Sequence, residues 1–286
     1  MIIKQLSEMN LIDNYLATVS MGHVKYGKEI VGTILKPIIG REIRIKESIV
    51  ENPIFPAEPG KHGVRLDAYV VEDIGEVEVE HGNIYDLEPD QNRDDKEILP
   101  LRSRFYHSML DKRALESGKN YDALPNAWVI FIVSYDPFGK DRMLYTIRNY
   151  CIEEPEMTYN DRATTLYLYV NGRNTDNCTK ELQELLRYMN ESTEENACNS
   201  DLKKIHSYIT SIKSEPATQE GLIMWSAYIE GELKKAAKEA NARTKEANAR
   251  ADAEKKRADA EKERADAAEI KILELQEKIR RYEEAR

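Results

Sequence analysis

The sequence predicts a mixed α/β domain that is followed by a helical segment and a long C-terminal helix. Three observations predict this. Short apolar runs typical of strands recur between residues 42 and 170, segments with apolar residues at helical spacing precede and interrupt them, and the alanine-rich stretch Ala236–Ala268 contains neither glycine nor proline. The expected boundaries are 1–174 for the α/β domain, 175–216 for the helical segment and 217–286 for the long helix.

The elements of the α/β domain are predicted from the spacing of apolar residues and from the positions of proline and glycine. Apolar residues at helical spacing predict a helix within Leu11–Ile39 that ends near Pro37 and Gly40. Strands are expected at Glu42–Val50, Val64–Val71, Asn83–Glu88, Ala127–Tyr135, Arg142–Cys151 and Thr164–Val170. A helix is expected from Pro100 to about Ser117, with Leu101, Phe105 and Met109 as its core face.

The C-terminal helix carries a seven-residue repeat, the period of a left-handed coiled coil. The a positions are Ala251, Ala258, Ala265, Ile272 and Ile279, and the d positions are Glu254, Glu261, Ala268, Leu275 and Tyr282. Only the last two heptads have a strongly apolar seam, so the coil should be weak upstream and tighter near the end. The repeat predicts a homo-oligomer; the alternative is a solitary charged helix held by i,i+4 ion pairs.

Composition excludes several classes of protein. The formal net charge is −10, from 42 basic and 52 acidic residues, so binding of nucleic acid through bulk positive charge is excluded. The longest apolar stretch, Ala127–Val133, is too short to cross a bilayer, and Met1–Gly22 has acidic residues where a signal peptide needs an apolar run; we expect a cytoplasmic protein without membrane partners. No thiolate zinc pattern, phosphate-binding loop or serine nucleophile elbow is present.

Two carboxylates stand within apolar strand patterns: Asp67 in the run Gly63–Val70 and Glu88 in the run Ile84–Gln91. A buried carboxylate costs several kcal/mol unless it is paired or coordinates a cation. Two of them on neighbouring strands suggest a shared Mg²⁺ or Mn²⁺ ion, which suits phosphodiester hydrolysis. Ordinary ion pairs, of Asp67 with Arg65 or Arg102 and of Glu88 with another basic side chain, are the alternative, and the spacing alone favours these ion pairs over a metal site.

A family resemblance covers about Leu11–Asn174. The segments that carry it, in order, are Gly63–Val70, Tyr85–Glu88, Leu99–Asp111, Leu115–Gly118, Tyr121–Leu124, Val129–Ile132, Tyr135–Gly139 and Leu144–Asn149. Together they resemble the recombination-promoting nuclease and putative transposase family of the PD-(D/E)XK superfamily. The resemblance implies a restriction-endonuclease-like αβββαβ core, Mg²⁺-dependent DNA endonuclease activity and a role in DNA transfer or mobile elements.

The resemblance also implies roles for particular residues. Asp67 matches the first metal carboxylate and Glu88 the second, and Glu29 in the first helix is the candidate for a third. The family pattern expects Lys or Gln two residues after the second carboxylate, but Pro89 and Asp90 follow Glu88 here, and Gln91 comes one place late.

This departure from the family pattern leaves two hypotheses. In the first, Pro89 forces a bulge that lets Gln91 replace the lysine, and the site is active. In the second, the domain is a degenerate nuclease that binds DNA or a protein without cutting.

Three residues on the helix after the second carboxylate are candidates for contact with DNA: Arg102, Arg104 and Tyr106. The alternative for Arg102 is a carboxylate contact that anchors the strand of Glu88. Dimerisation through the coil would suit the cutting of both strands of a duplex. A transposase that also joins ends is a third interpretation, and the sequence does not separate it from a nuclease.

Overall fold

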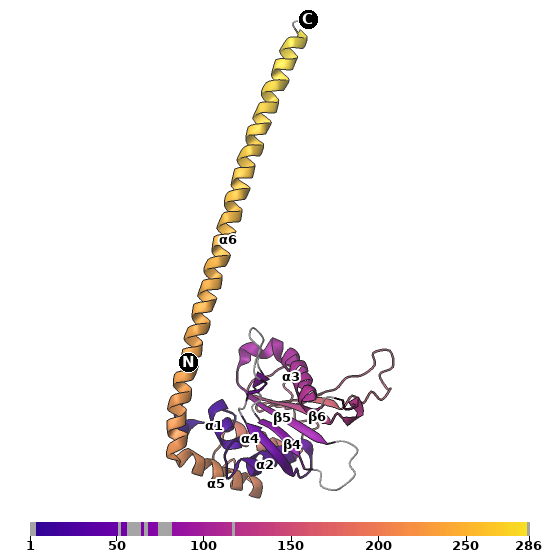
Figure 1. The fold of residues 1–286 in the computed structure, drawn as a ribbon, viewed down its shortest axis with the longest axis vertical. Helices are drawn as coiled ribbons and strands as arrows, with labels where there is room; N and C mark the ends of the chain where they lie inside the picture. The colour runs from indigo at the N-terminus through magenta and orange to yellow at the C-terminus, as the bar shows by residue number, and fades with distance from the viewer. Residues whose placement is uncertain are drawn as a thin grey trace. The chain divides into compact units, whose positions relative to one another are not determined.

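The computed structural model describes residues 4–50, 53–55, 64–65, 68–73, 82–115 and 118–284. The chain divides into two compact units, Met1–Ile223 and Met224–Arg286. The first unit is a mixed α/β fold around an open six-stranded sheet, and the second consists of most of the long C-terminal helix (Figure 1). The predicted fold class is therefore confirmed at the level of a mixed α/β fold with a long C-terminal helix.

The sheet combines an antiparallel half with a parallel half. Its strands, in spatial order, are β1 (Ile45–Val50), β4 (Ala68–Glu72), β5 (Asn83–Asp90), β6 (Asn126–Val133), β8 (Ala163–Tyr169) and β7 (Leu144–Ile147). The pairs β1–β4, β4–β5 and β7–β8 are antiparallel, whereas β5–β6 and β6–β8 are parallel. Two short strands, β2 (Pro53–Phe55) and β3 (Val64–Arg65), pair separately. Helix α3 (Leu99–Ala114) makes the crossover that the parallel pair β5–β6 requires.

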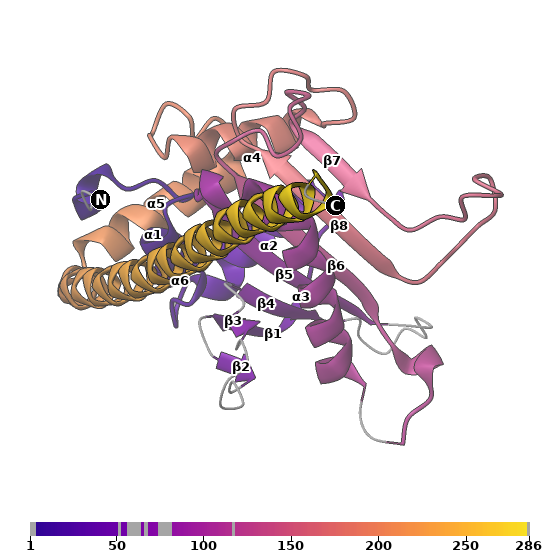
Figure 2. The same cartoon turned by 90° about the horizontal axis from the view of Figure 1, so that it is seen from above.

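Helices cover both faces of this sheet. Helix α3 packs on β6, above a core that includes Ile84, Val129, Phe131 and Tyr167. The other layer consists of α1 (Asn14–Met21), α2 (Gly27–Ile39), α4 (Lys180–Asn190) and α5 (Ser200–Ser214). In this layer α2 contacts β1, α4 and α5, and Figures 1 and 2 show α3 on the opposite side of the sheet from α2.

The single helix predicted within Leu11–Ile39 is two helices. The chain turns between Gly22 and Tyr26, where Val24 is fully exposed. Gly27 permits the turn, because a Cβ atom at this position would lie 2.3 Å from the carbonyl oxygen of Met21. The predicted end near Gly40 is confirmed: α2 stops at Ile39, and Gly40 adopts the left-handed conformation that favours glycine, with φ of 81°.

The predicted core face of α3 is wrong at two of its three residues, since only Met109 packs against the core. Leu101 and Phe105 are 55% and 43% exposed, whereas Leu99 and Leu110 are fully buried. The physical reason is that part of the inward side faces the carboxylates of β5 and carries their polar partner Arg102 beside the buried leucines. Periodicity of apolar residues alone selects the wrong side of such a helix.

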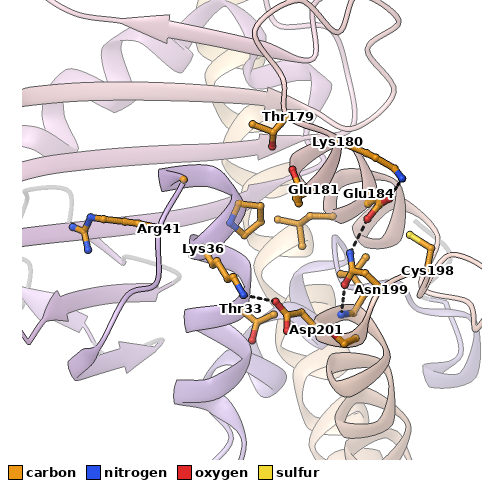
Figure 3. A pocket seen from close by; sticks show the side chains of 15 residues that line it. Thr33, Lys36, Arg41, Thr179, Lys180, Glu181, Glu184, Cys198, Asn199 and Asp201 are labelled. Carbon is orange, nitrogen blue, oxygen red and sulfur yellow. Dashed lines mark hydrogen bonds and ion pairs between the residues drawn. The ribbon is translucent and has the colours of Figure 1, made fainter.

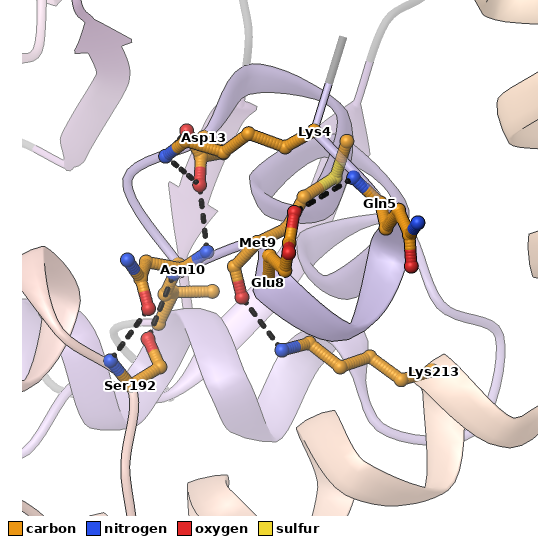
Figure 4. A network of polar contacts seen from close by, with 9 residues as sticks. Lys4, Gln5, Glu8, Met9, Asn10, Asp13, Ser192 and Lys213 are labelled. Carbon is orange, nitrogen blue, oxygen red and sulfur yellow. Dashed lines mark hydrogen bonds and ion pairs between the residues drawn. The ribbon is translucent and has the colours of Figure 1, made fainter.

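The N-terminal residues are tied to the later helices by a polar network (Figure 4). The Ser192 amide donates to Asn10 at 2.9 Å, and the Leu11 amide donates to the Ser192 hydroxyl at 2.8 Å. Lys213 of α5 donates to the carbonyl oxygen of Met9 at 2.6 Å. Through these contacts the predicted helical segment 175–216 packs as part of the first compact unit.

The last helix, α6 (Pro216–Glu284), has 69 residues and begins inside the first unit. Its coiled-coil seam is exposed in the single chain: Ile272, Leu275 and Ile279 are 54%, 50% and 57% accessible. Arg250 pairs with Glu246, and Arg281 with Glu277, at i,i+4 spacing. Such pairs contribute only about 0.3–0.5 kcal/mol each, so they do not replace burial of the apolar stripe.

Candidate active site on strand β5

Three carboxylates lie in a row on one face of β5. Side chains alternate along a strand, so Asp86, Glu88 and Asp90 share the face of Ile84, which belongs to the core beneath α3. They are 0%, 2% and 5% exposed. Each lies beside an apolar residue of β6, since the register pairs them with Val129, Phe131 and Val133. Burial of this kind requires compensating charge.

Arg102 supplies charge at the end of this row. It stands in the first turn of α3, and its side chain is 24% exposed. Its Nη1 donates a hydrogen bond to Oδ2 of Asp90, and its Nη2 lies 3.5 Å from Oε2 of Glu88. The guanidinium carbon also lies 5.2 Å from the ring centre of Phe131, a favourable cation–π distance. This is the strand-anchoring contact that the sequence offered as the alternative role for Arg102.

Tyr106 completes the polar face of α3. Its hydroxyl accepts a hydrogen bond of 3.3 Å from Nη2 of Arg102, and its ring stacks near Phe131. Burial raises the pKa of the Tyr106 phenol, and the negative charge of Glu88 raises it further. Burial acts to lower the pKa of the Arg102 guanidinium, but Tyr106, Asp90 and Glu88 outweigh that effect and raise it. Arg102 therefore stays protonated and Tyr106 neutral near pH 7.

Asp67, the first predicted metal ligand, lies outside the described residues. Its chain neighbour Ala68 is the first residue of β4 and pairs with Leu87 of β5, the residue before Glu88. Glu88, the second predicted ligand, lies in the buried row. Within the described residues, no group of three or more His, Cys, Asp or Glu side chains is arranged to hold a metal ion. Carboxylate oxygens are nonetheless the donors that Mg²⁺ and Mn²⁺ prefer, and Glu88 provides one buried carboxylate.

The predicted bulge at Pro89 is not present against β6. The parallel register runs without a shift through Glu88–Phe131, Pro89–Ile132 and Asp90–Val133. Gln91 follows directly after the strand and is exposed. The register with β6 therefore continues through Pro89, although proline has no backbone N–H to donate. The structure thus gives no bulge that would turn Gln91 toward the carboxylates.

Glu29 is not brought together with the carboxylates of β5. Its carboxylate accepts hydrogen bonds from Lys204 and from the Tyr208 hydroxyl of α5, the latter at 2.5 Å. These hydrogen bonds lower the pKa of Glu29. Glu29 therefore contacts the helical layer of α2 and α5, whereas Glu88 faces α3.

Two features that sequence reasoning missed complete the site. Asp86 and Asp90 continue the row of Glu88, and their i,i+2 spacing on a strand is the signal that would have found them. Of the predicted DNA contacts, Arg104 is exposed on α3, whereas Arg102 is only partly exposed and contacts β5.

A cavity of about 460 Å³ opens at the carboxyl ends of β5, β6 and β8. Its lining residues are Arg93, Lys96, Ser134, Tyr135, Asp136, Gly139 and Tyr169. Asp136 shapes the rim by accepting hydrogen bonds from the amides of residues 138, 139 and 141. Burial acts to raise the pKa of Asp136, but these hydrogen bonds keep it below its usual value. Carboxyl ends of parallel strands are common binding positions in α/β sheets.

A second cavity, of about 520 Å³, lies between α2 and the first turns of α4 and α5 (Figure 3). Several of its polar groups pair with one another. Lys36 lies 2.7 Å from Asp201, and Asn199 donates to Glu184 at 2.7 Å. Thr179 and Asn199 cap the two helices with their own side chains. The paired and capping groups therefore have structural roles.

Comparison with family models, with curated proteins and with solved structures finds no match. Among the described residues, no helix has the length and apolar character needed to span a membrane.

Proposed function

We propose that the chain is a Mg²⁺- or Mn²⁺-dependent DNA endonuclease with a restriction-endonuclease-like core, in which Asp67 and Glu88 hold the metal. The observation that carries the proposal is the pairing of Ala68 with Leu87. The proposal extends this antiparallel register by one residue, which sets Asp67 opposite Glu88. Apart from the separate pair β2 and β3, the order α2, β1, β4, β5, α3, β6 supports it, since this is a helix, three antiparallel strands, a helix and a parallel strand.

A divalent cation held there would polarise a phosphoryl oxygen and lower the pKa of the attacking water. Arg102 is the cationic side chain beside Glu88, and in this proposal it stabilises negative charge on the phosphoryl group. Gln91 remains the sequence-based candidate for the same role. Arg93 and Lys96, at the carboxyl end of β5, would hold the phosphate backbone.

The contacts of Arg102 favour a second candidate, a domain that binds without cutting. Because Arg102 neutralises Asp90 and contacts Glu88, part of the charge that would attract a cation is already balanced. In either case, we propose that α6 joins copies of the chain.

Nicking of supercoiled plasmid with Mg²⁺, Mn²⁺ or EDTA separates the two candidates. For the endonuclease, Asp67→Ala and Glu88→Gln should each lower the rate at least 100-fold, while Glu97→Ala, an exposed acidic residue nearby, should not. Thermal unfolding of each variant shows whether the fold persists. If clean wild-type protein shifts a labelled duplex in fluorescence anisotropy but leaves the plasmid intact, the binding module is correct.

The expected role in DNA transfer rests on the family resemblance. A strand-transfer assay with labelled ends tests whether the protein joins DNA as well as cutting it.

A further inference from the structure

The heptad repeat of α6 has a charge pattern that depends on position. The g positions from Arg243 to Lys278 are all basic: Arg243, Arg250, Arg257, Arg264, Lys271 and Lys278. The e positions change along the helix, from Asn241, Asn248, Lys255 and Lys262 to Glu269, Gln276 and Glu283. Residues at e and g flank the seam and set the orientation of the partner helix.

We infer that α6 pairs with α6 of a second copy in parallel and in register, as a two-stranded coiled coil whose tight part spans Ala265–Ile279. The inference rests on the proposed pairing of copies and adds its orientation. In an antiparallel pair each g residue faces another g residue, so basic side chains oppose one another along the whole seam. A parallel pair is free of this repulsion in its C-terminal part.

The parallel arrangement pairs each g residue with the e residue five positions later on the other helix. Arg264 then meets Glu269 of the second copy, and Lys278 meets Glu283 of the second copy. By symmetry each contact occurs twice. Upstream, Arg257 would meet Lys262, which agrees with the weak seam there.

The apolar residues of the seam select two strands. In parallel coils, a β-branched residue at a with leucine at d favours a dimer. Ile272 and Ile279 occupy a positions, and Leu275 occupies the d position between them. All three are at least half exposed in the single chain, so this stripe is available for burial. A parallel pair joins both copies of Met1–Ile223 at the same end of the coil, as cleavage of two strands requires.

Light scattering of the full chain tests the pairing. The expected mass is twice the 33.0 kDa of one chain. Ile272→Asp with Ile279→Asp, both on the seam, should give a monomer. Ile270→Asp with Leu273→Asp, at positions f and b of the same helix, is the matched control and should remain a dimer. A monomeric wild type, or a trimer or tetramer, overturns the inference.

Disulfide formation tests the orientation. In a background with Cys151, Cys178 and Cys198 replaced by serine, Ala265→Cys and Ile279→Cys should each form a covalent dimer under oxidised glutathione. Ile270→Cys, off the seam, should not. The two seam positions lie two heptads apart, so an antiparallel pair places at most one of them opposite itself. A dimer by light scattering that cross-links at only one position, or at neither, overturns the orientation and leaves the pairing intact.

Discussion

Arg102 of α3 donates a hydrogen bond to Asp90, the last residue of β5 and 12 positions earlier in the chain. The same guanidinium lies 3.5 Å from Glu88. One partly exposed cation thus balances two buried carboxylates and fixes the first turn of α3 to the strand. The contact therefore stabilises the fold and also lies at the proposed active site.

Replacement of Arg102 should destabilise the first unit. Arg102→Met keeps the aliphatic volume but leaves the carboxylates of Asp90 and Glu88 without their guanidinium, which costs about 3 kcal/mol. Arg104→Met, two residues along the same helix and exposed, should change the free energy of unfolding by less than ~0.5 kcal/mol. Urea denaturation followed by circular dichroism measures both. Equal stability of the two variants would show that Arg102 does not compensate these charges.

Leucine substitutions can show which side of α3 faces the core. Leu99→Ala or Leu110→Ala removes a fully buried side chain and should lower the free energy of unfolding by about 2–5 kcal/mol. Leu101→Ala removes an exposed one and should change it by no more than ~0.5 kcal/mol. A larger effect at Leu101 than at Leu99 in the same urea experiment would restore the face expected from apolar spacing.

The sequence predicted the strands better than the helices that cover them. The buried strand β6 lies within the predicted Ala127–Tyr135 apart from its first residue. The prediction succeeded because a continuous apolar run between turn residues is typical of a strand that is covered on both faces. The turn before Gly27 was missed, because it depends on a close approach to the Met21 carbonyl oxygen that spacing does not encode. The face of α3 was missed because its inward side mixes the buried Leu99 and Leu110 with Arg102, which contacts the carboxylates of β5.

The candidate site was predictable only in part. Glu88 stands in an apolar strand pattern, and a carboxylate in that setting needs a partner, so its importance was visible in the sequence. The contact of Arg102 with Asp90 was not, since it depends on which side of α3 faces β5. The contacts of Glu29 were not predictable either, because its partners Lys204 and Tyr208 are 175 and 179 residues away in the chain.

Two glycines should respond to alanine in opposite ways. In a helix, alanine is favoured over glycine by about 1 kcal/mol. At Gly231 of α6 a Cβ atom would meet no described atom within 4 Å, so Gly231→Ala should raise helical content slightly. At Gly27 the Cβ atom would lie 2.3 Å from the Met21 carbonyl oxygen, so Gly27→Ala should lower the free energy of unfolding by more than about 1 kcal/mol. Circular dichroism and urea titration check the pair; a stabilised Gly27→Ala variant would contradict the close approach.

His107 should make stability depend on pH. Its Nε2 lies 3.0 Å from the Thr165 hydroxyl, and its buried Nδ1 has no hydrogen-bond partner among the described residues. Burial lowers the pKa of this imidazole below 6.5, although Asp161 acts in the opposite direction.

Because the folded protein resists protonation of His107 and the unfolded chain does not, this contribution to stability is complete above pH 6.5 and is lost as the pH falls below it. The loss cannot exceed about 1.4 kcal/mol per pH unit for one proton. His107→Gln, which keeps a partner for Thr165, should lose less stability than the wild type between pH 7.5 and pH 5.5 in urea titrations. Identical losses in both proteins would assign the pH dependence to other groups.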